Sequence, residues 1–197
     1  MRIGLVGPGE DETLFREAVS FLLGTGDAEQ IVYLGDAAFL EAATARWVAE
    51  LGVATEDDFR RRVLEVAMSG SADDVEQLLS RDAITAGLAQ IRKLPPAPAR
   101  AIELIDDRVV VFVHDKAVLD EEDIANAAMV AYGKASEAGV RRFGKRLFVT
   151  PGPLAGRRVA MIEDERDGAF VAILELGGQA VAREALGGGS TKLTVAG

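Results

Sequence analysis

A short apolar run close to Met1 constrains the fold more than any other feature. Residues 2–6 read RIGLV and stop at Gly7-Pro8-Gly9. Because glycine and proline interrupt regular structure, this pattern predicts a buried strand followed by a tight turn. Three acids follow at residues 10–12, and apolar residues then recur at helical spacing as far as residue 23. Acids suit the positive end of a helix dipole, so a helix is expected directly after the turn.

The alternation of strand and helix continues, and strands then predominate. A second buried strand is expected at 31–34, closed by Gly35-Asp36, and helices are expected at 37–51, 56–68, 73–91 and 120–127. A proline-rich stretch at 94–98 separates the two halves, and a hairpin is expected across Asp106-Asp107. The predicted later strands are 101–105, 109–113, 129–132, 146–150, 159–163, 170–175, 179–184 and 192–195. This order favours an α/β fold built as a two-layer β-sandwich flanked by helices.

The composition limits the kinds of partner. The chain has 197 residues, 49% of them hydrophobic, which suits a single domain over 1–197. Its net charge of −10 argues against nucleic acid or an anionic membrane, which attract proteins through Lys and Arg. It contains no cysteine and no apolar run near the roughly 20 residues of a membrane span. Its first residues, MRIGLVGPGE, lack the apolar segment and cleavage site of a secretory leader, so no such leader is expected. A cytoplasmic protein is expected.

Two common site types are not supported. A dinucleotide fingerprint beginning at Gly7 would need glycine at residue 12, where Glu12 stands, and the nearby acids would repel a pyrophosphate. The single histidine, His114, has no nucleophile elbow to complete a Ser/His/Asp triad. We therefore expect no organic cofactor.

Three polar residues follow predicted strands, where α/β proteins place their sites. Asp36 follows the second strand, His114 follows 109–113 and Lys134 follows Tyr132-Gly133. Each has a structural alternative. Asp36 can cap the next helix, His114 can be a structural residue, and Lys134 can be a solvated surface group.

The ordered series of these segments resembles the calcineurin-like metallophosphoesterases, specifically their small bacterial phosphodiesterases. The segments are MRIGLVGPGEDETLFREAV, IVYLGDAAFLEAA, AMSGSADDV, LPPAPARAIELIDDRVVVFVHDK, MVAYGKASEAGV, KRLFVTPGPL and GAFVAILEL. The resemblance covers about residues 1–185. It implies a metallophosphoesterase-like fold and, in the family, two divalent metals held by Asp, His and Asn side chains.

The departures from the family pattern fall on those metal ligands. By the resemblance, Pro8 and Glu10 replace the first aspartate and histidine, while Ser71 and Ala72 replace the asparagine and the histidine that assists catalysis. Lys134 and Ser136 replace the last two histidines. Among the ligands, Asp36 and His114 remain.

This set of residues suits a metal pair poorly. Two adjacent divalent ions need several anionic or imidazole ligands, whereas Pro8 offers no side-chain donor and Lys134 brings a positive charge. We therefore expect no metal; a single ion, if bound, would lie on Glu10, Asp36 and His114. We also expect Lys134 to replace the missing metal charge by pairing with Asp36, with His114 close by.

The resemblance and its departures together predict a non-catalytic interaction or scaffold module. The superfamily offers a precedent in the retromer scaffold subunit, which uses this fold to hold partners. The partner here would be another protein or a second copy of the chain. The alternative is a phosphodiesterase, phosphatase or phosphate-ester binder with a rebuilt site, either with one metal or metal-free, in which Lys134 and Arg141 or Arg142 supply positive charge.

Overall fold

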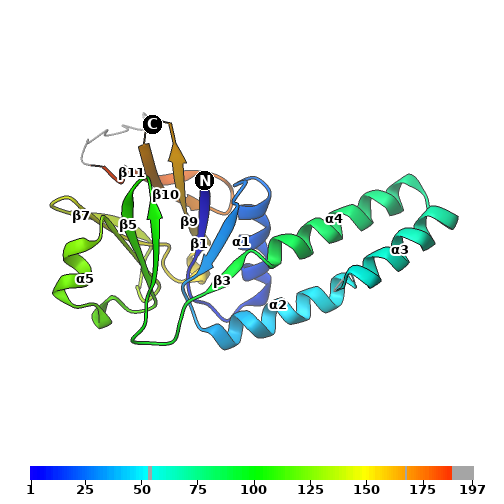
Figure 1. The fold of residues 1–197 in the computed structure, drawn as a ribbon, viewed down its shortest axis with the longest axis horizontal. Coiled ribbons are helices and arrows are strands. Elements are labelled where there is room, and N and C mark those ends of the chain that lie inside the picture. The colour runs from blue at the N-terminus through cyan, green and yellow to red at the C-terminus, as the bar shows by residue number, and fades with distance from the viewer. Residues whose placement is uncertain (53–54, 167, 188–197) are drawn as a thin grey trace.

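Two mixed β-sheets face each other, and helices cover their outer faces (Figure 1). The computed structural model describes residues 1–52, 55–166 and 168–187. Strand order is β11-β10-β9-β1-β2-β3 in the first sheet and β4-β5-β6-β8-β7 in the second. The expected two-layer sandwich flanked by helices is confirmed.

The first sheet contains both parallel and antiparallel pairs of strands. Its strands are β1 (Arg2–Val6), β2 (Gln30–Tyr33), β3 (Ile91–Lys93), β9 (Arg158–Glu165), β10 (Gly168–Glu175) and β11 (Ala180–Ala185). β1 pairs in parallel with β2, and β2 with β3, whereas β9 runs antiparallel to β1. The loops that follow β1, β2 and β3 therefore leave the same edge of the sheet.

The second sheet has the same mixed character. Its strands are β4 (Ala101–Ile105), β5 (Arg108–Val113), β6 (Met129–Tyr132), β7 (Gly139–Phe143) and β8 (Arg146–Thr150). β5, β6 and β8 are parallel neighbours. The β4–β5 hairpin turns through Asp106 and Asp107, whose φ values of 51° and 57° are those that a two-residue hairpin turn requires.

Strand alternation divides the apolar residues between the interior of the sandwich and its two outer faces. Ile3 and Leu5 point into the core between the sheets, together with Val110 and Phe112 of β5. Val6 points the other way, toward the helices α1 (Glu12–Leu23) and α2 (Ala37–Leu51). The segment that contains η1 (Lys116–Val118) and α5 (Glu121–Asn126) covers the outer face of the second sheet.

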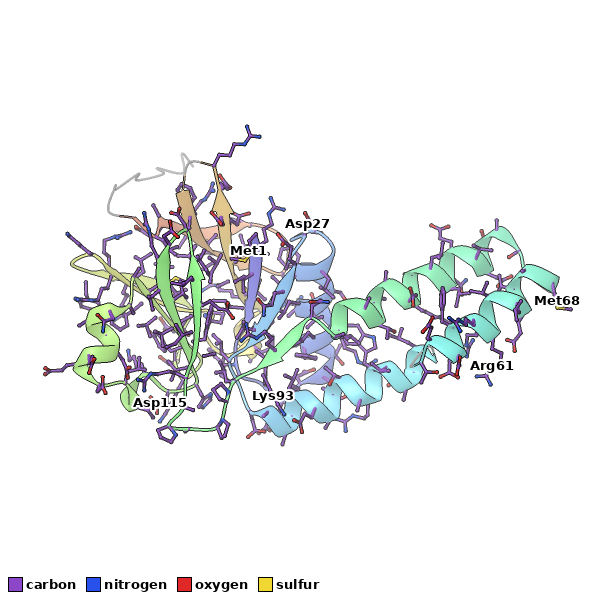
Figure 2. The ribbon with its side chains drawn as sticks, viewed as in Figure 1. Met1, Asp27, Arg61, Met68, Lys93 and Asp115 are labelled. Atoms are coloured by element: carbon purple, nitrogen blue, oxygen red, sulfur yellow. The ribbon has the colours of Figure 1, made fainter. Side chains whose placement is uncertain are left out.

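The two helices α3 (Glu56–Ser69) and α4 (Ala72–Leu88) form a hairpin that extends away from the sandwich (Figures 1 and 2). We call these two helices the arm. Among the described side chains α3 buries none, and α4 buries only Leu78 and Leu88. The arm is therefore largely outside the core.

Three places where the strands differ from the predictions, or cannot be compared with them, need comment. The expected helix 73–91 ends at Leu88, and Ile91–Lys93 forms β3 at the edge of the first sheet. The edge strand β7 was not expected. Both carry polar residues and lack the continuous apolar run of a central strand. The strand expected at 192–195 lies outside the described residues.

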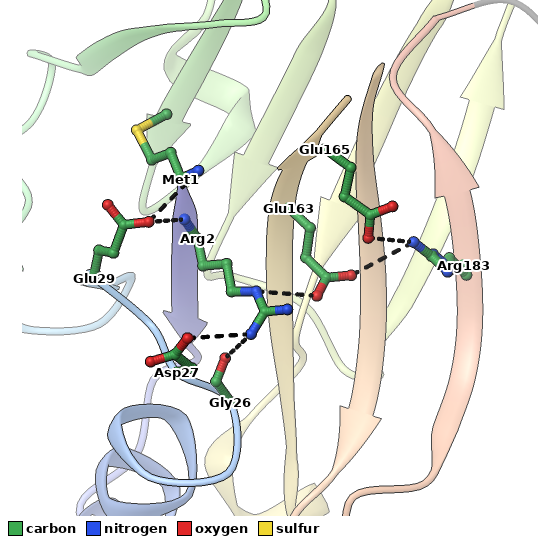
Figure 3. A network of polar contacts seen from close by, with 8 residues as sticks. All are labelled: Met1, Arg2, Gly26, Asp27, Glu29, Glu163, Glu165 and Arg183. Carbon is green, nitrogen blue, oxygen red and sulfur yellow. Dashed lines mark hydrogen bonds and ion pairs between the residues drawn. The ribbon is translucent and has the colours of Figure 1, made fainter. Parts of the chain in front are cut away.

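Ion pairs join strands of the first sheet at the end away from the loops that follow β1 and β2 (Figure 3). Arg2 Nε lies 3.6 Å from Glu163 of β9, and an Arg2 terminal nitrogen lies 3.5 Å from Asp27. Arg183 of β11 lies 3.0 Å from Glu165 and 3.7 Å from Glu163. Because these groups are partly exposed, each pair contributes at most about 1 kcal/mol.

No helix within the described ranges is long and apolar enough to cross a membrane.

Candidate functional site

The loops at the carboxyl ends of the parallel strands meet where the two sheets touch. A Cβ atom at Gly7 would overlap the carbonyl oxygen of Gly152, and one at Gly133 would overlap that of Leu34. Glycine is therefore required at both positions for the backbones to approach so closely. Leu154, in η2 (Leu154–Gly156), also donates its N–H to Pro8 O at 2.8 Å.

A cavity of about 520 Å³ opens at this junction, and we call it the site cavity. Its lining residues are Pro8, Gly9, Glu10, Tyr33, Asp36, Phe39, His114 and Pro153. The structure thus brings together four of the residues that the sequence singled out: Pro8, Glu10, Asp36 and His114.

Tyr33 lies against the glycine loop and is 1% exposed. Its hydroxyl donates to Gly9 O at 3.0 Å, and Gly9 N–H donates to the same hydroxyl at 3.3 Å. Burial raises the pKa of Tyr33 to about 12, and the charges of Asp36 and Glu10 act in the same direction. A neutral phenol therefore anchors the loop after β1.

Asp36 caps helix α2. Its Oδ1 accepts the backbone N–H of Ala38 at 2.7 Å and of Phe39 at 3.1 Å. The capping alternative is therefore confirmed. One carboxylate oxygen is occupied by the start of the helix, which is a sufficient structural reason for aspartate here.

His114 ties the second sheet to the first. Its Nδ1 lies 2.8 Å from the carbonyl oxygen of Leu34, which can only accept, so Nδ1 carries a proton. His114 therefore has the structural role that was its alternative in the sequence, since Nδ1 bonds the two sheets together. Nε2 is the remaining polar atom of the ring.

The expected pair between Asp36 and Lys134 is wrong. Lys134 Nζ lies 2.5 Å from Asp115 Oδ2, and its side chain is 67% exposed. This hydrogen bond is the main cause that lowers the pKa of the Asp115 carboxyl. The physical reason is local: Lys134 N–H donates to His114 O at 2.7 Å, which sets the lysine beside the residue after His114.

Ser71 and Ala72 lie outside the site altogether, at the turn of the arm. Ser71 caps α4 in a reciprocal capping box with Asp74, and Ala72 is the first residue of that helix. The prediction that they replace the family's asparagine and histidine at the metal site is wrong, because the Ser-x-x-Asp sequence begins a helix here. Ser136 lines a separate cavity, together with Lys134.

The loop after β3 was missed as part of the site. With Asp36 and His114 it borders a further cavity of about 470 Å³, lined by Leu94, Pro95, Pro96 and Ala97 among others. The sequence feature that could have indicated this loop is its run of prolines. This loop segment brings no carboxylate, imidazole or amide side chain to the site.

The residues at the site do not fit a metal pair. Glu10, Asp36 and His114 share the site cavity, but within the described ranges no three His, Cys, Asp or Glu side chains are grouped to hold an ion. Pro8 and residues 94–97 supply no side-chain ligand.

The sandwich of two mixed sheets flanked by helices is the metallophosphoesterase fold. Neither a protein-family model nor a curated protein sequence matches the chain. A Streptococcus pneumoniae structure, described as a conserved uncharacterized protein and predicted phosphoesterase, is similar with a TM-score of 0.50 and 13% identity, over 93% of this chain and 97% of that one.

Two further structures are similar. Vps29 of Entamoeba histolytica, solved as a zinc complex, has a TM-score of 0.50 and 12% identity, over 94% of this chain and 99% of that one. An archaeal phosphodiesterase has a TM-score of 0.49 and 16% identity, over 88% of this chain and 100% of that one. The Streptococcus and Vps29 structures support the fold; function is argued from this chain's own residues.

Proposed function

We propose that this protein is a non-catalytic interaction protein with a metallophosphoesterase fold, and that it assembles with a second copy through the arm. The observation that carries the proposal is the exposed apolar surface of α3 and α4. Leu64, Met68 and Leu79 are 64%, 87% and 58% exposed, and Val63 and Val75 are also exposed.

The energetics of the arm favour a helical partner. Fully burying one such side chain stabilises an assembly by about 1.5–3 kcal/mol. A hairpin of two helices cannot enclose its own apolar residues from all sides, whereas four helices can. Two arms packed side by side would provide those four helices.

The charges along the arm favour a second copy in antiparallel orientation. Residues 63–80, which include the outer turn, contain Glu65, Asp73, Asp74 and Glu76 and no Lys or Arg. Arg60 and Arg61 lie nearer the sandwich and are 67% and 66% exposed on their side chains. Two outer ends would repel each other, whereas an antiparallel pair places each acidic end against residues 56–62, where three arginines balance three acids.

The site supports the non-catalytic half of the proposal. The Asp36 carboxylate caps a helix, the His114 ring is tied to Leu34, and Lys134 pairs with Asp115. The usual nucleophile of metal-dependent phosphoester hydrolysis is a water activated by a bound metal. The residues here do not supply the ligands that would hold such a metal.

Sedimentation equilibrium over a concentration series tests the proposal. We expect a dimer for the wild-type chain and a monomer for the double variant Leu64→Glu, Leu79→Glu. Leu104→Glu is the matched control, because Leu104 of β4 is 68% exposed and lies outside the arm. A wild-type monomer at every concentration, or a dimer that survives the double variant, would overturn the proposal.

Charge reversal tests the orientation. Arg60→Glu with Arg61→Glu should weaken the dimer by opposing acid to acid. Adding Asp73→Lys and Glu76→Lys to this variant should restore the dimer, since the two arginine positions are then acidic and the two acidic positions are then basic. Failure of the second pair to restore association would contradict the antiparallel arrangement.

A further inference from the structure

A smaller, polar cavity lies beside the outer face of the second sheet. Its volume is about 220 Å³, and it is bordered by η1, the loop after β6 and strand β7. It shares no lining residue with the site cavity or with the cavity beside the loop after β3. It is therefore a separate place on the molecule.

Three cations line this cavity in a chain whose net charge is −10. Arg141 forms no ion pair with any carboxylate of the described residues, and Lys116 Nζ lies 4.5 Å from the centre of the Tyr132 ring. Lys134 is offset by Asp115, and Glu137 is the carboxylate in the lining. The positive charges of Arg141 and Lys116 are thus available to an anion.

Thr150 adds a buried hydroxyl to the lining. It is 3% exposed. Its Oγ1 accepts the N–H of Gly152 at 3.1 Å. Because a hydroxyl can accept and donate together, its proton remains able to donate to a ligand.

We propose that this cavity binds a small oxyanion, specifically a phosphate group. A guanidinium matches the tetrahedral oxygens of phosphate with two N–H groups, and ammonium and hydroxyl donors complete the set. The volume lies below the roughly 300–1,000 Å³ of drug-sized pockets, which fits a phosphate or the phosphate end of a small ester. The proposal involves binding alone and does not depend on the arm.

The test is a phosphate titration of the full chain at constant ionic strength, followed by backbone amide chemical shifts. We expect saturable shifts at residues 136–139 with inorganic phosphate, and none with equivalent chloride. Arg141→Gln should weaken binding by about tenfold or more, since it removes charge-assisted hydrogen bonds. Glu137→Gln should strengthen binding, because it removes the opposing charge.

Lys145→Gln is the matched control. Lys145 is an exposed cation of the β7–β8 turn, outside the cavity lining, so its loss should leave binding unchanged. The proposal is overturned if phosphate gives no saturable shift, or if Arg141→Gln binds as the wild type does.

A parallel titration with glycerol 3-phosphate distinguishes the source of the phosphate group. Tighter binding of the ester would identify a phosphorylated small molecule, and tighter binding of inorganic phosphate would identify the free ion. In both cases Arg141→Gln must weaken binding. An ester that binds equally well to Arg141→Gln would contradict the assignment.

Discussion

Lys134 illustrates how exposure limits what a charge contributes. Its pair with Asp115 is mostly solvated on the lysine side. Exposed pairs typically contribute about 0–1 kcal/mol because water and salt screen them. The residue is therefore a surface group with one neighbour and does not replace a metal charge.

Replacing Lys134 with alanine should consequently lower the free energy of unfolding by at most about 1 kcal/mol. Urea denaturation of the wild type and of Lys134→Ala measures the difference. A loss of about 3–5 kcal/mol, typical when one partner of a buried pair is removed, would show that the lysine is buried in solution.

Tyr33 predicts a pH dependence at alkaline pH. Its pKa in the folded protein is about 12, above the ordinary value of 10.0. The stability from its neutral form is therefore complete below pH 10 and is lost as pH rises from there toward about 12. Tyrosinate absorbance should show a component near pH 12 that Tyr33→Phe removes; a component removed near pH 10 would contradict the burial.

At the scale of elements, helix starts explain two of the polar residues that the resemblance assigned to a site, Asp36 and Ser71. Asp11, Asp36 and Ser71 all cap helices by accepting N–H groups of the first turn. Such residues look alike in a sequence whether they serve a helix or a ligand.

Asp36→Ala should cost about 1 kcal/mol of stability, whereas Asp36→Asn should cost little, since asparagine caps nearly as well. Asp11→Ala is the comparison, because Asp11 Oδ1 accepts from Thr13 and Leu14 in the same way. Thermal unfolding of the three variants provides the measurement. An Asn variant as unstable as the Ala variant would mean that the charge of Asp36 is needed.

The sequence predicted the central strands and helices well because their signals are strong. β1, β2 and β5 are apolar runs, and α1 begins with acidic residues at the positive end of its helix dipole. It failed at β3 and β7, whose edge positions tolerate polar residues. It also misplaced Ser71, whose role is a local capping box with Asp74. It paired Lys134 wrongly, because no pattern in the sequence shows that Lys134 lies beside Asp115.

For the whole molecule, the absence of a fitting donor set predicts a lack of hydrolysis. With Mn²⁺, Ni²⁺ or Mg²⁺, the purified chain should not turn over bis-p-nitrophenyl phosphate. Asp36→Ala is the control, since any true turnover at the site cavity should be lost in it. Activity that follows the wild-type protein through purification and disappears in the variant would contradict the non-catalytic proposal.

The most direct measurement of the central proposal is the distance between spin labels in the dimer. The chain has no cysteine, so Ser80→Cys near the middle of α4 and Ala67→Cys near the outer end of α3 each give one label per copy. In an antiparallel pair of arms, the two Ser80→Cys labels should lie close together. The two Ala67→Cys labels should be farther apart, by roughly 15 Å along the arms at a rise of about 1.5 Å per residue. Ala67→Cys labels closer than the Ser80→Cys labels, or no distance between copies at all, would contradict assembly through antiparallel arms.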